Sequence, residues 1–385
     1  MLKKVIILFL ILPSCIAFSM EKNHDHSIAT SFTIDNQGYL WRVYEEMGLL
    51  IVDYSNDFGK TFSNPVNVIA TSQQIGTSGD ARPKIGADSK GNIFVTWTEN
   101  LKKPYTGYIW FSSSKDRGKS FSQPIIVHKD REEITHRFDS LLIDKNDRIN
   151  IAWIDKRDLI LSKKTNKEYV GAAVYLTFSD DHGLSFKPER KVADNSCECC
   201  RIAIDESKNN LVLLWRHVYS GNIRDHAISF IKENIIAPPK RVTYTGWKVD
   251  ACPHQGPALV ADNSNNYHIS WFDGGENFGL YYNKIDENGD ALFKPIKIGA
   301  QLSISDHSAL LSINQDLYLS WREINQESQK INLMISNDNG ATWTEPQLIF
   351  EDLKTIDHPH LVSFKNDVYI GFNTKNNGFK LFKLN

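Results

Sequence analysis

One eight-residue pattern, Ser-x-Asp-x-Gly-x-(Ser/Thr)-(Phe/Trp), occurs four times in this chain of 385 residues. The copies span residues 55–62, 114–121, 179–186 and 336–343. An Asp side chain accepts backbone N–H bonds within a turn, and a Gly two positions later permits a positive φ. The hydroxyl closes the turn locally, and the aromatic ring packs beneath it. Each copy therefore predicts a structural turn between two β-strands, and four copies predict a repeated β-sheet unit.

A second repeat runs in step with the first. An Asp-containing turn precedes a strand of alternating apolar residues that ends in an aromatic anchor. These seven anchors are Tyr44, Trp97, Trp153, Trp215, Trp271, Trp321 and Phe372. Their spacing fits units of four short strands, with the box between the third and the fourth. No segment of helical period follows the N-terminal region, so we expect an all-β fold. We expect this fold to be a β-propeller with seven four-stranded blades; six blades and an appended hairpin are the alternative.

The later units depart from the pattern. The fourth keeps nothing of the box over residues 230–238, and the fifth keeps a remnant over residues 285–289. The seventh ends at its third strand, residues 379–384. We expect residues 23–27 to add the missing outer strand, because closing a ring removes long open sheet edges.

The N-terminus predicts export. A basic pair precedes an apolar run over residues 5–12, which is too short to span a bilayer. We therefore expect a signal peptide over residues 1–19 and one propeller domain over residues 20–385, periplasmic or secreted. Lipidation of Cys15, giving an outer-membrane lipoprotein, is the alternative. The formal net charge of −2 favours neither a nucleic-acid nor a membrane-surface partner. We expect a monomer with no transmembrane span.

Charged residues, His and Cys recur where the first strand of each unit begins. In a propeller this strand lines the central channel, and its start lies on the face where ligands usually bind. A second set of polar residues stands two positions beyond the anchors, on the same side of the sheet. This set comprises Glu46, Glu99, Asp155, His217, Asp273 and Glu323. We expect a rim site for a small polar ligand; a ring of salt bridges that merely satisfies strand ends is the alternative.

Four cysteines remain beyond the predicted leader, and three of them fall within four residues. They are Cys197, Cys199, Cys200 and Cys252, the last followed by Pro253 and His254. The two halves open adjacent inner strands, so we expect them to be neighbours. Three interpretations stay open. Disulfides are typical of exported proteins, and a Cys200–Cys252 bridge would stabilise by about 4 kcal/mol. Thiolates with imidazole also suit copper or zinc, and a redox thiol pair is the third.

The repeated box resembles the Asp-box, or BNR repeat, of the sialidase-like β-propeller superfamily. The resemblance covers residues 25–385. It implies three arginines that bind a substrate carboxylate, an Asp acid/base, and a Tyr nucleophile activated by a Glu. Arg82-Pro83 resembles the motif of the first arginine. The resemblance further implies the substrate-binding candidates Arg137, Arg201 and Arg322, and the acid/base candidates Asp80 and Asp139. From the second polar set, Asp155 and Asp273 are further substrate-binding candidates. No Tyr–Glu pair has a supporting spacing.

The Cys-x-Cys-Cys-Arg and Cys-Pro-His-x-Gly-Pro motifs are foreign to the usual sialidase. They resemble those of an exported bacterial group of Asp-box propellers whose reaction is uncharacterised. Two hypotheses of different classes follow. One is a sialidase-like glycoside hydrolase, or a lectin related to one, acting on an acidic glycan at the rim. The other is an envelope protein that binds copper or zinc through the Cys/His residues. A propeller that binds protein partners is the third alternative.

Overall fold

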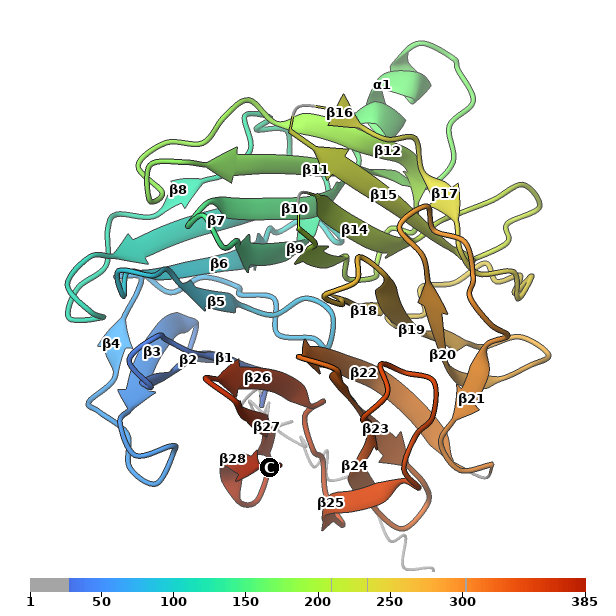
Figure 1. Cartoon of the computed structure of the whole chain (residues 1–385). Helices are drawn as coiled ribbons and strands as arrows, with labels where there is room; N and C mark the ends of the chain where they lie inside the picture. The colour runs from blue at the N-terminus through green and yellow to red at the C-terminus, as the bar shows by residue number, and fades with distance from the viewer. Residues whose placement is uncertain (1–27, 209, 234, 302) are drawn as a thin grey trace, which may run out of the picture.

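The computed structural model describes residues 28–385 except 209, 234 and 302. Seven antiparallel sheets stand around a ring in chain order (Figure 1). The seven-bladed β-propeller is therefore confirmed. The predicted leader, Cys15 and the segment 23–27 lie outside the described residues.

Each blade is a meander in which sequential strands pair. Blade 1 contains β1 (Thr30–Ile34), β2 (Leu40–Glu46), β3 (Leu49–Ser55) and β4 (Val66–Asn67). Blade 2 contains β5 (Lys84–Ala87), β6 (Ile93–Asn100), β7 (Gly107–Ser114) and β8 (Ile125–Ile126). Blade 3 contains β9 (His136–Ile143), β10 (Ile149–Asp155), β11 (Ala172–Ser179) and β12 (Arg190–Ser196).

The remaining blades follow the same order with two variations. Blade 4 contains β13 (Ala203–Glu206), β14 (Leu211–Arg216), β15 (His226–Lys232), β16 (Ile235–Ile236) and β17 (Lys240–Arg241). Blade 5 contains β18 (Ala258–Ala261), β19 (Tyr267–Asp273), β20 (Gly279–Ile285) and β21 (Ile296–Ile298). Blade 6 contains β22 (Ile304–Ile313), β23 (Asp316–Ile324), β24 (Gln329–Ser336) and β25 (Gln347–Asp352). Blade 7 contains β26 (His360–Phe364), β27 (Asp367–Thr374) and β28 (Gly378–Lys383). In blade 4 both β16 and β17 pair with β15.

The aromatic anchors lie in the second strand of every blade and fill the space between blades. Six of the seven are at most 3% exposed, from Trp97 to Phe372. Tyr44 differs, because it is only half-buried and donates its hydroxyl to Asp53 at 3.2 Å. Trp41, three residues earlier on the same strand, is buried in its place and donates its indole N–H to Asp35. The prediction of Tyr44 as the core residue of blade 1 was wrong.

The four boxes form the same turn. In the first, the Asp57 carboxylate accepts the backbone N–H of Thr61 at 2.9 Å and its hydroxyl at 2.7 Å, while Ser55 accepts the N–H of Gly59 at 2.8 Å. The other three turns repeat these bonds. Every hydrogen-bonding group of the Asp is thus used inside its own turn, which fits the structural role predicted for the boxes.

The ring closes where blade 1 meets blade 7. The backbone N–H of Thr30 donates to Asp357, and Phe32 packs edge-on against Phe379 with ring centroids 5.3 Å apart. Asn373 also donates to the Thr30 hydroxyl at 3.1 Å. The first and last blades therefore pack on each other although they lie at opposite ends of the chain.

One helix, α1 (Arg157–Lys164), departs from the expected all-β chain. It lies in the connection between β10 and β11, with Asp158 in its first turn and Lys163 and Lys164 in its last. These charges complement the helix dipole. The helix escaped prediction because it is short and has a weak apolar face. No helix in the described part of the chain is long and apolar enough to cross a membrane.

Candidate functional site

The inner strands begin on the face opposite the boxes. In blade 1, Leu40 pairs with the box residue Ser55 at one end of the hairpin, and Glu46 pairs with Leu49 at the other. Because the strands are antiparallel, the starts of β5, β9, β13, β18, β22 and β26 lie on this second face. The residues that precede and open these strands form two adjoining clusters, here called the channel cluster and the cysteine cluster.

The channel cluster is built on Arg82. Its guanidinium binds the Asp357 carboxylate in a fork, with Nη1 at 2.8 Å and Nη2 at 2.6 Å. Nη2 lies 3.0 Å from His358 Nδ1, and Nη1 lies 3.1 Å from His360 Nε2. Burial, together with the charge of Arg82, holds the pKa values of both histidines well below their usual range. Neutral imidazoles thus accept from an arginine that is only 3% exposed.

Arg322 makes a second fork beside the first. It binds Asp306 with distances of 2.9 Å and 2.8 Å and donates to the backbone oxygen of Ile356. His307 follows Asp306 and stacks on His358 with ring centroids 4.8 Å apart. Arg82 and Arg322, two of the four predicted substrate-binding arginines, therefore reach the rim, but internal carboxylates occupy their forks.

Asp80 and Arg201 hold the chain segment that follows His254. Asp80 Oδ2 accepts the backbone N–H of Gly256 at 2.9 Å, and Arg201 donates to the oxygens of Pro257 and Ser308. Gly256 is needed here because a Cβ atom would lie 2.2 Å from Arg201 Cγ. Among the described residues no hydrogen-bond partner reaches Asp80 Oδ1, which lies 3.8 Å from His307 Nε2.

Asp139, the other predicted acid/base, is fully buried. It accepts the hydroxyls of Thr96 at 2.7 Å and Thr98 at 3.0 Å. Lys84 is close enough for attraction to the Asp139 charge, but burial dominates and lowers the pKa of this amine. These bonds link blade 3 to blade 2.

The second polar set mostly fixes strand ends. Asp155 accepts the Trp153 indole at 2.8 Å and the Arg157 guanidinium at 2.7 Å, and lies 3.0 Å from His136 Nδ1. Asp273 accepts the N–H of Gly275 at 2.8 Å. These contacts resemble the strand-end alternative considered for this set.

The cysteine cluster joins the two Cys-containing segments, as their positions predicted. Cys197 Sγ lies 3.7 Å from Cys199 Sγ and 3.9 Å from Cys200 Sγ. Ligand atoms of Cys199, Cys252 and His254 lie within 4.8 Å of one another. Cys199 thus belongs to both groups. All four are free thiols, and Cys252 stands near Cys199 rather than closing the Cys200 bridge considered above.

Cationic side chains surround these thiols. Arg224 donates to Cys197 Sγ at 3.4 Å. Hydrogen bonds from Cys199 and Cys200, with the charges of Arg216 and Arg224, place the pKa of Cys197 well below its usual range. Arg137 is a predicted site residue that lies on this side, where Cys199 and Cys252 oppose the lowering of its pKa by burial. Hydrogen bonding with Cys197 raises the pKa of Cys199 and burial raises the pKa of Cys200, so negative charge in the cluster is favoured at Cys197.

Arg216 and Trp247 support the cysteine cluster and were not assigned this role from the sequence. Arg216 donates to the backbone oxygens of Gln255, Phe272 and Arg224, and its guanidinium lies 4.9 Å from the Trp247 ring centroid. It thereby ties Gln255, directly after the Cys252–His254 segment, to β19 and to the residues before β15. The one sign of this role in the sequence was Trp247, which lies outside the strand repeat.

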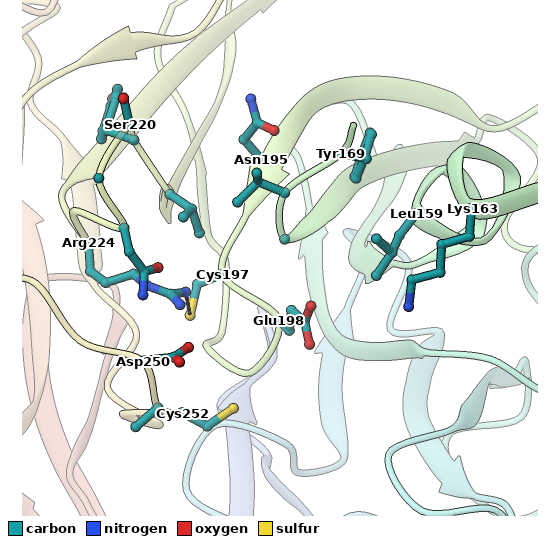
Figure 2. A pocket seen from close by; sticks show the side chains of 17 residues that line it. Leu159, Lys163, Tyr169, Asn195, Cys197, Glu198, Ser220, Arg224, Asp250 and Cys252 are labelled. Carbon is teal, nitrogen blue, oxygen red and sulfur yellow. Dashed lines mark hydrogen bonds between the residues drawn. The ribbon is translucent and has the colours of Figure 1, made fainter. Parts of the chain in front are cut away.

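Two hollows meet at the cysteine cluster. A hollow of about 860 Å³ is lined by Cys197, Glu198, Arg224 and Cys252, which Figure 2 shows together. A hollow of about 210 Å³ at the channel mouth is lined by Arg82, His254, His307, Arg322, Asp357 and His358, among others. Cys252 and His254 are exposed, whereas the other three cysteines are buried. Ligand groups of the cysteine cluster are thus accessible from two sides.

No protein-family model and no curated protein matches this chain. Solved structures with similar folds include an ulvan lyase of polysaccharide lyase family PL25, bound to GlcA(1-4)Rha3S. It has 9% identity and a TM-score of 0.58 over 93% of this chain and 94% of that one. A protein of unknown function from Dyadobacter fermentans has 14% identity and a TM-score of 0.53, covering 80% and 94%. An α-L-arabinanase from Penicillium chrysogenum has 13% identity and a TM-score of 0.51, covering 81% and 97%. The chain therefore shares its propeller fold with enzymes that act on polysaccharides.

Proposed function

We propose that this protein binds a soft metal ion, Cu(I) in preference to Zn²⁺, at the cysteine cluster. The observation that carries the proposal is the convergence of three free thiols and one imidazole on the thiol of Cys199. Soft thiolates select Cu(I) and zinc, and imidazole binds both. A structural zinc ion completes a tetrahedron of four ligands, whereas each group here offers three. Three soft ligands suit Cu(I), so copper is the first candidate.

The first test is the metal content of the whole chain, purified without chelator and loaded anaerobically with Cu(I) or with Zn²⁺. We expect tight retention of Cu(I) and its loss in Cys199→Ser, because Cys199 belongs to both groups. Ser270→Ala is a matched control, since Ser270 is also a fully buried small side chain and its hydroxyl has no partner among the described residues. Melting curves show whether either variant is folded. A folded Cys199→Ser protein with unchanged metal content would refute the proposal.

An acidic glycan at the channel mouth is the second candidate. It is favoured by Oδ1 of buried Asp80, which accepts no hydrogen bond within the described residues and lies 3.8 Å from both His307 and Arg201, within a rim that also carries Arg82 and Arg322. Fold neighbours that act on polysaccharides make a sugar ligand reasonable. A sialidase-like reaction would use Asp80 or Asp139 as the acid/base, with Arg137, Asp155 and Asp273 at the edge of the site. No turnover of fluorogenic sialosides and uronides, with no binding on a glycan array, would exclude it.

Both functions fit an exported monomer, periplasmic, secreted or lipid-anchored through Cys15. Fractionation of the expressing cell, with mass spectrometry of the mature N-terminus, tests the predicted cleavage after residue 19. A mature chain that starts at Cys15 and carries lipid would favour the lipoprotein instead.

A further inference from the structure

The cysteine cluster offers two ligand groups that differ in accessibility. The inner group, Cys197, Cys199 and Cys200, is buried, with no thiol more than 4% exposed. The outer group consists of Cys199, Cys252 and His254, and the last two are exposed. The groups share one sulfur atom. A metal ion bound at the exposed ligands Cys252 and His254 is therefore already within reach of Cys199, which is also a ligand of the inner group.

One of the surrounding hollows reaches both groups, and the other reaches the outer group alone. Cys252 lines the larger hollow together with Cys197, and His254 lines the smaller one at the channel mouth. Arg216 holds the end of the segment that carries Cys252 and His254, because one amino group donates to the backbone oxygens of both Gln255 and Phe272. The outer ligands are accordingly held beside Cys199 rather than carried on a free loop end.

Resting on the proposed metal binding, we propose that the protein transfers a single Cu(I) ion from the outer group to the inner group. Cys199 remains bound throughout. The ion exchanges its bonds to Cys252 and His254 for bonds to Cys197 and Cys200, and its oxidation state does not change. Each incoming sulfur binds as a thiolate and releases any proton that it carries; the departing Cys252 thiolate takes up one proton, and any second proton passes to solvent. The outer group is a capture site and the inner group a holding site.

X-ray absorption spectroscopy of the protein with one equivalent of Cu(I) tests the end point. We expect a first shell of sulfur alone in the unmodified protein. In Cys200→Ser the holding site is incomplete, so we expect copper to stay with the capture ligands and to show a nitrogen neighbour. Cys197→Ser serves as a second inner variant if the first does not fold. A nitrogen neighbour in the unmodified protein would overturn the transfer while leaving metal binding intact.

Loading kinetics test the route. Copper is offered as its bicinchoninate complex, whose colour reports the loss of Cu(I) to the protein. In His254→Ala we expect the loading rate to fall on the order of tenfold, with a smaller change in the affinity for Cu(I). His182→Ala is the matched control, because His182 shares the left-handed backbone of His254 but lies in a box turn on the other face.

Equal losses of rate and affinity in His254→Ala would make this histidine a ligand of a single site and overturn the transfer. Uptake of two equivalents with a copper–copper distance in the absorption spectrum would also overturn it, in favour of a dinuclear cluster bridged by Cys199. Failure to bind copper at all would instead refute the proposed function itself.

Discussion

The channel cluster and the cysteine cluster lie on one face of the same propeller, yet their polar groups are used differently. At the channel mouth, the forks of Arg82 and Arg322 are filled by Asp357 and Asp306. In the cysteine cluster the thiols contact mainly one another and Arg224. A cluster of charged residues is therefore a weaker sign of a ligand site than donor atoms that form no strong bond within the protein.

The energetic reason is that a buried ion pair tolerates little rearrangement. Removing one partner leaves an uncompensated charge in a medium that solvates it poorly. A ligand that displaced Asp357 from Arg82 would have to meet that cost. The free thiols impose no comparable cost, because a metal ion replaces protons and weak sulfur contacts.

Replacing Arg82 by Ala is expected to have the largest effect and to test whether the channel cluster is structural. The change strands the buried Asp357 carboxylate, so the free energy of unfolding should fall by about 3–5 kcal/mol. Urea denaturation measures it. Arg148→Ala is the control, because its pair with Asp180 is exposed and should contribute about 0–1 kcal/mol. If Arg82→Ala is no worse than this control, the Arg82 fork is available to a ligand and the contrast between the clusters fails.

Metal loading is expected to stabilise the fold through the cysteine cluster alone. A ligand that binds only the folded state at about 100 times its Kd adds about 2.7 kcal/mol. We therefore expect a higher Tm with Cu(I) than without it, reversed by a Cu(I) chelator. Cys199→Ser should abolish the shift, whereas the channel variant Arg322→Ala should retain it despite a lower starting Tm. A shift that survives Cys199→Ser would place the metal elsewhere.

Acidification is expected to have the smallest effect on stability. It tests the boxes, which lie on the face opposite the two clusters. Hydrogen bonds within each turn lower the pKa values of Asp57 and Asp338 to about 2, from the model-peptide value of 3.8. Because the folded pKa is the lower one, this stabilisation is complete above about pH 4 and is lost as the pH falls through about 2. Thermal melts across this range measure it.

Asp-to-Asn substitution of the boxes should flatten that pH dependence. Lys294→Ala, outside every box and cluster, should leave it unchanged. If the box variants melt with the same pH slope as the unmodified protein, these carboxylates do not contribute as their contacts predict.

The sequence allowed most of the fold to be predicted, because boxes and anchors are local. A box needs only eight consecutive residues, and Trp97, Trp153 and Trp321 follow from strand alternation. The choice of Tyr44 as the anchor of blade 1 was wrong because its strand carries two aromatic residues. Which of them is buried depends on the neighbouring blade, and Trp41 fills the space beside that blade better. Helix α1 lies in a loop where no repeat constrains the chain.

The site could be predicted only as a set of residues. The meeting of Cys199 with Cys252 and His254 followed from their positions at the starts of adjacent strands. The pairing of Arg82 with Asp357, 275 residues apart, did not follow, because it depends on how ring closure places blades 2 and 7 on either side of blade 1. Spacing places side chains on a rim, but it does not tell which of them neutralise one another.

The closure of the ring has a consequence for biosynthesis. The partners of Arg82 and of the edge of blade 1 lie near the C-terminus. The ribosome adds Asp357 275 residues after Arg82. At about 5–20 residues per second this delay is roughly tens of seconds. During that interval the edge of blade 1 stays uncovered, and an unpaired strand edge makes a partly folded chain prone to aggregate. The same contacts that lock the finished ring thus make its synthesis a period of vulnerability.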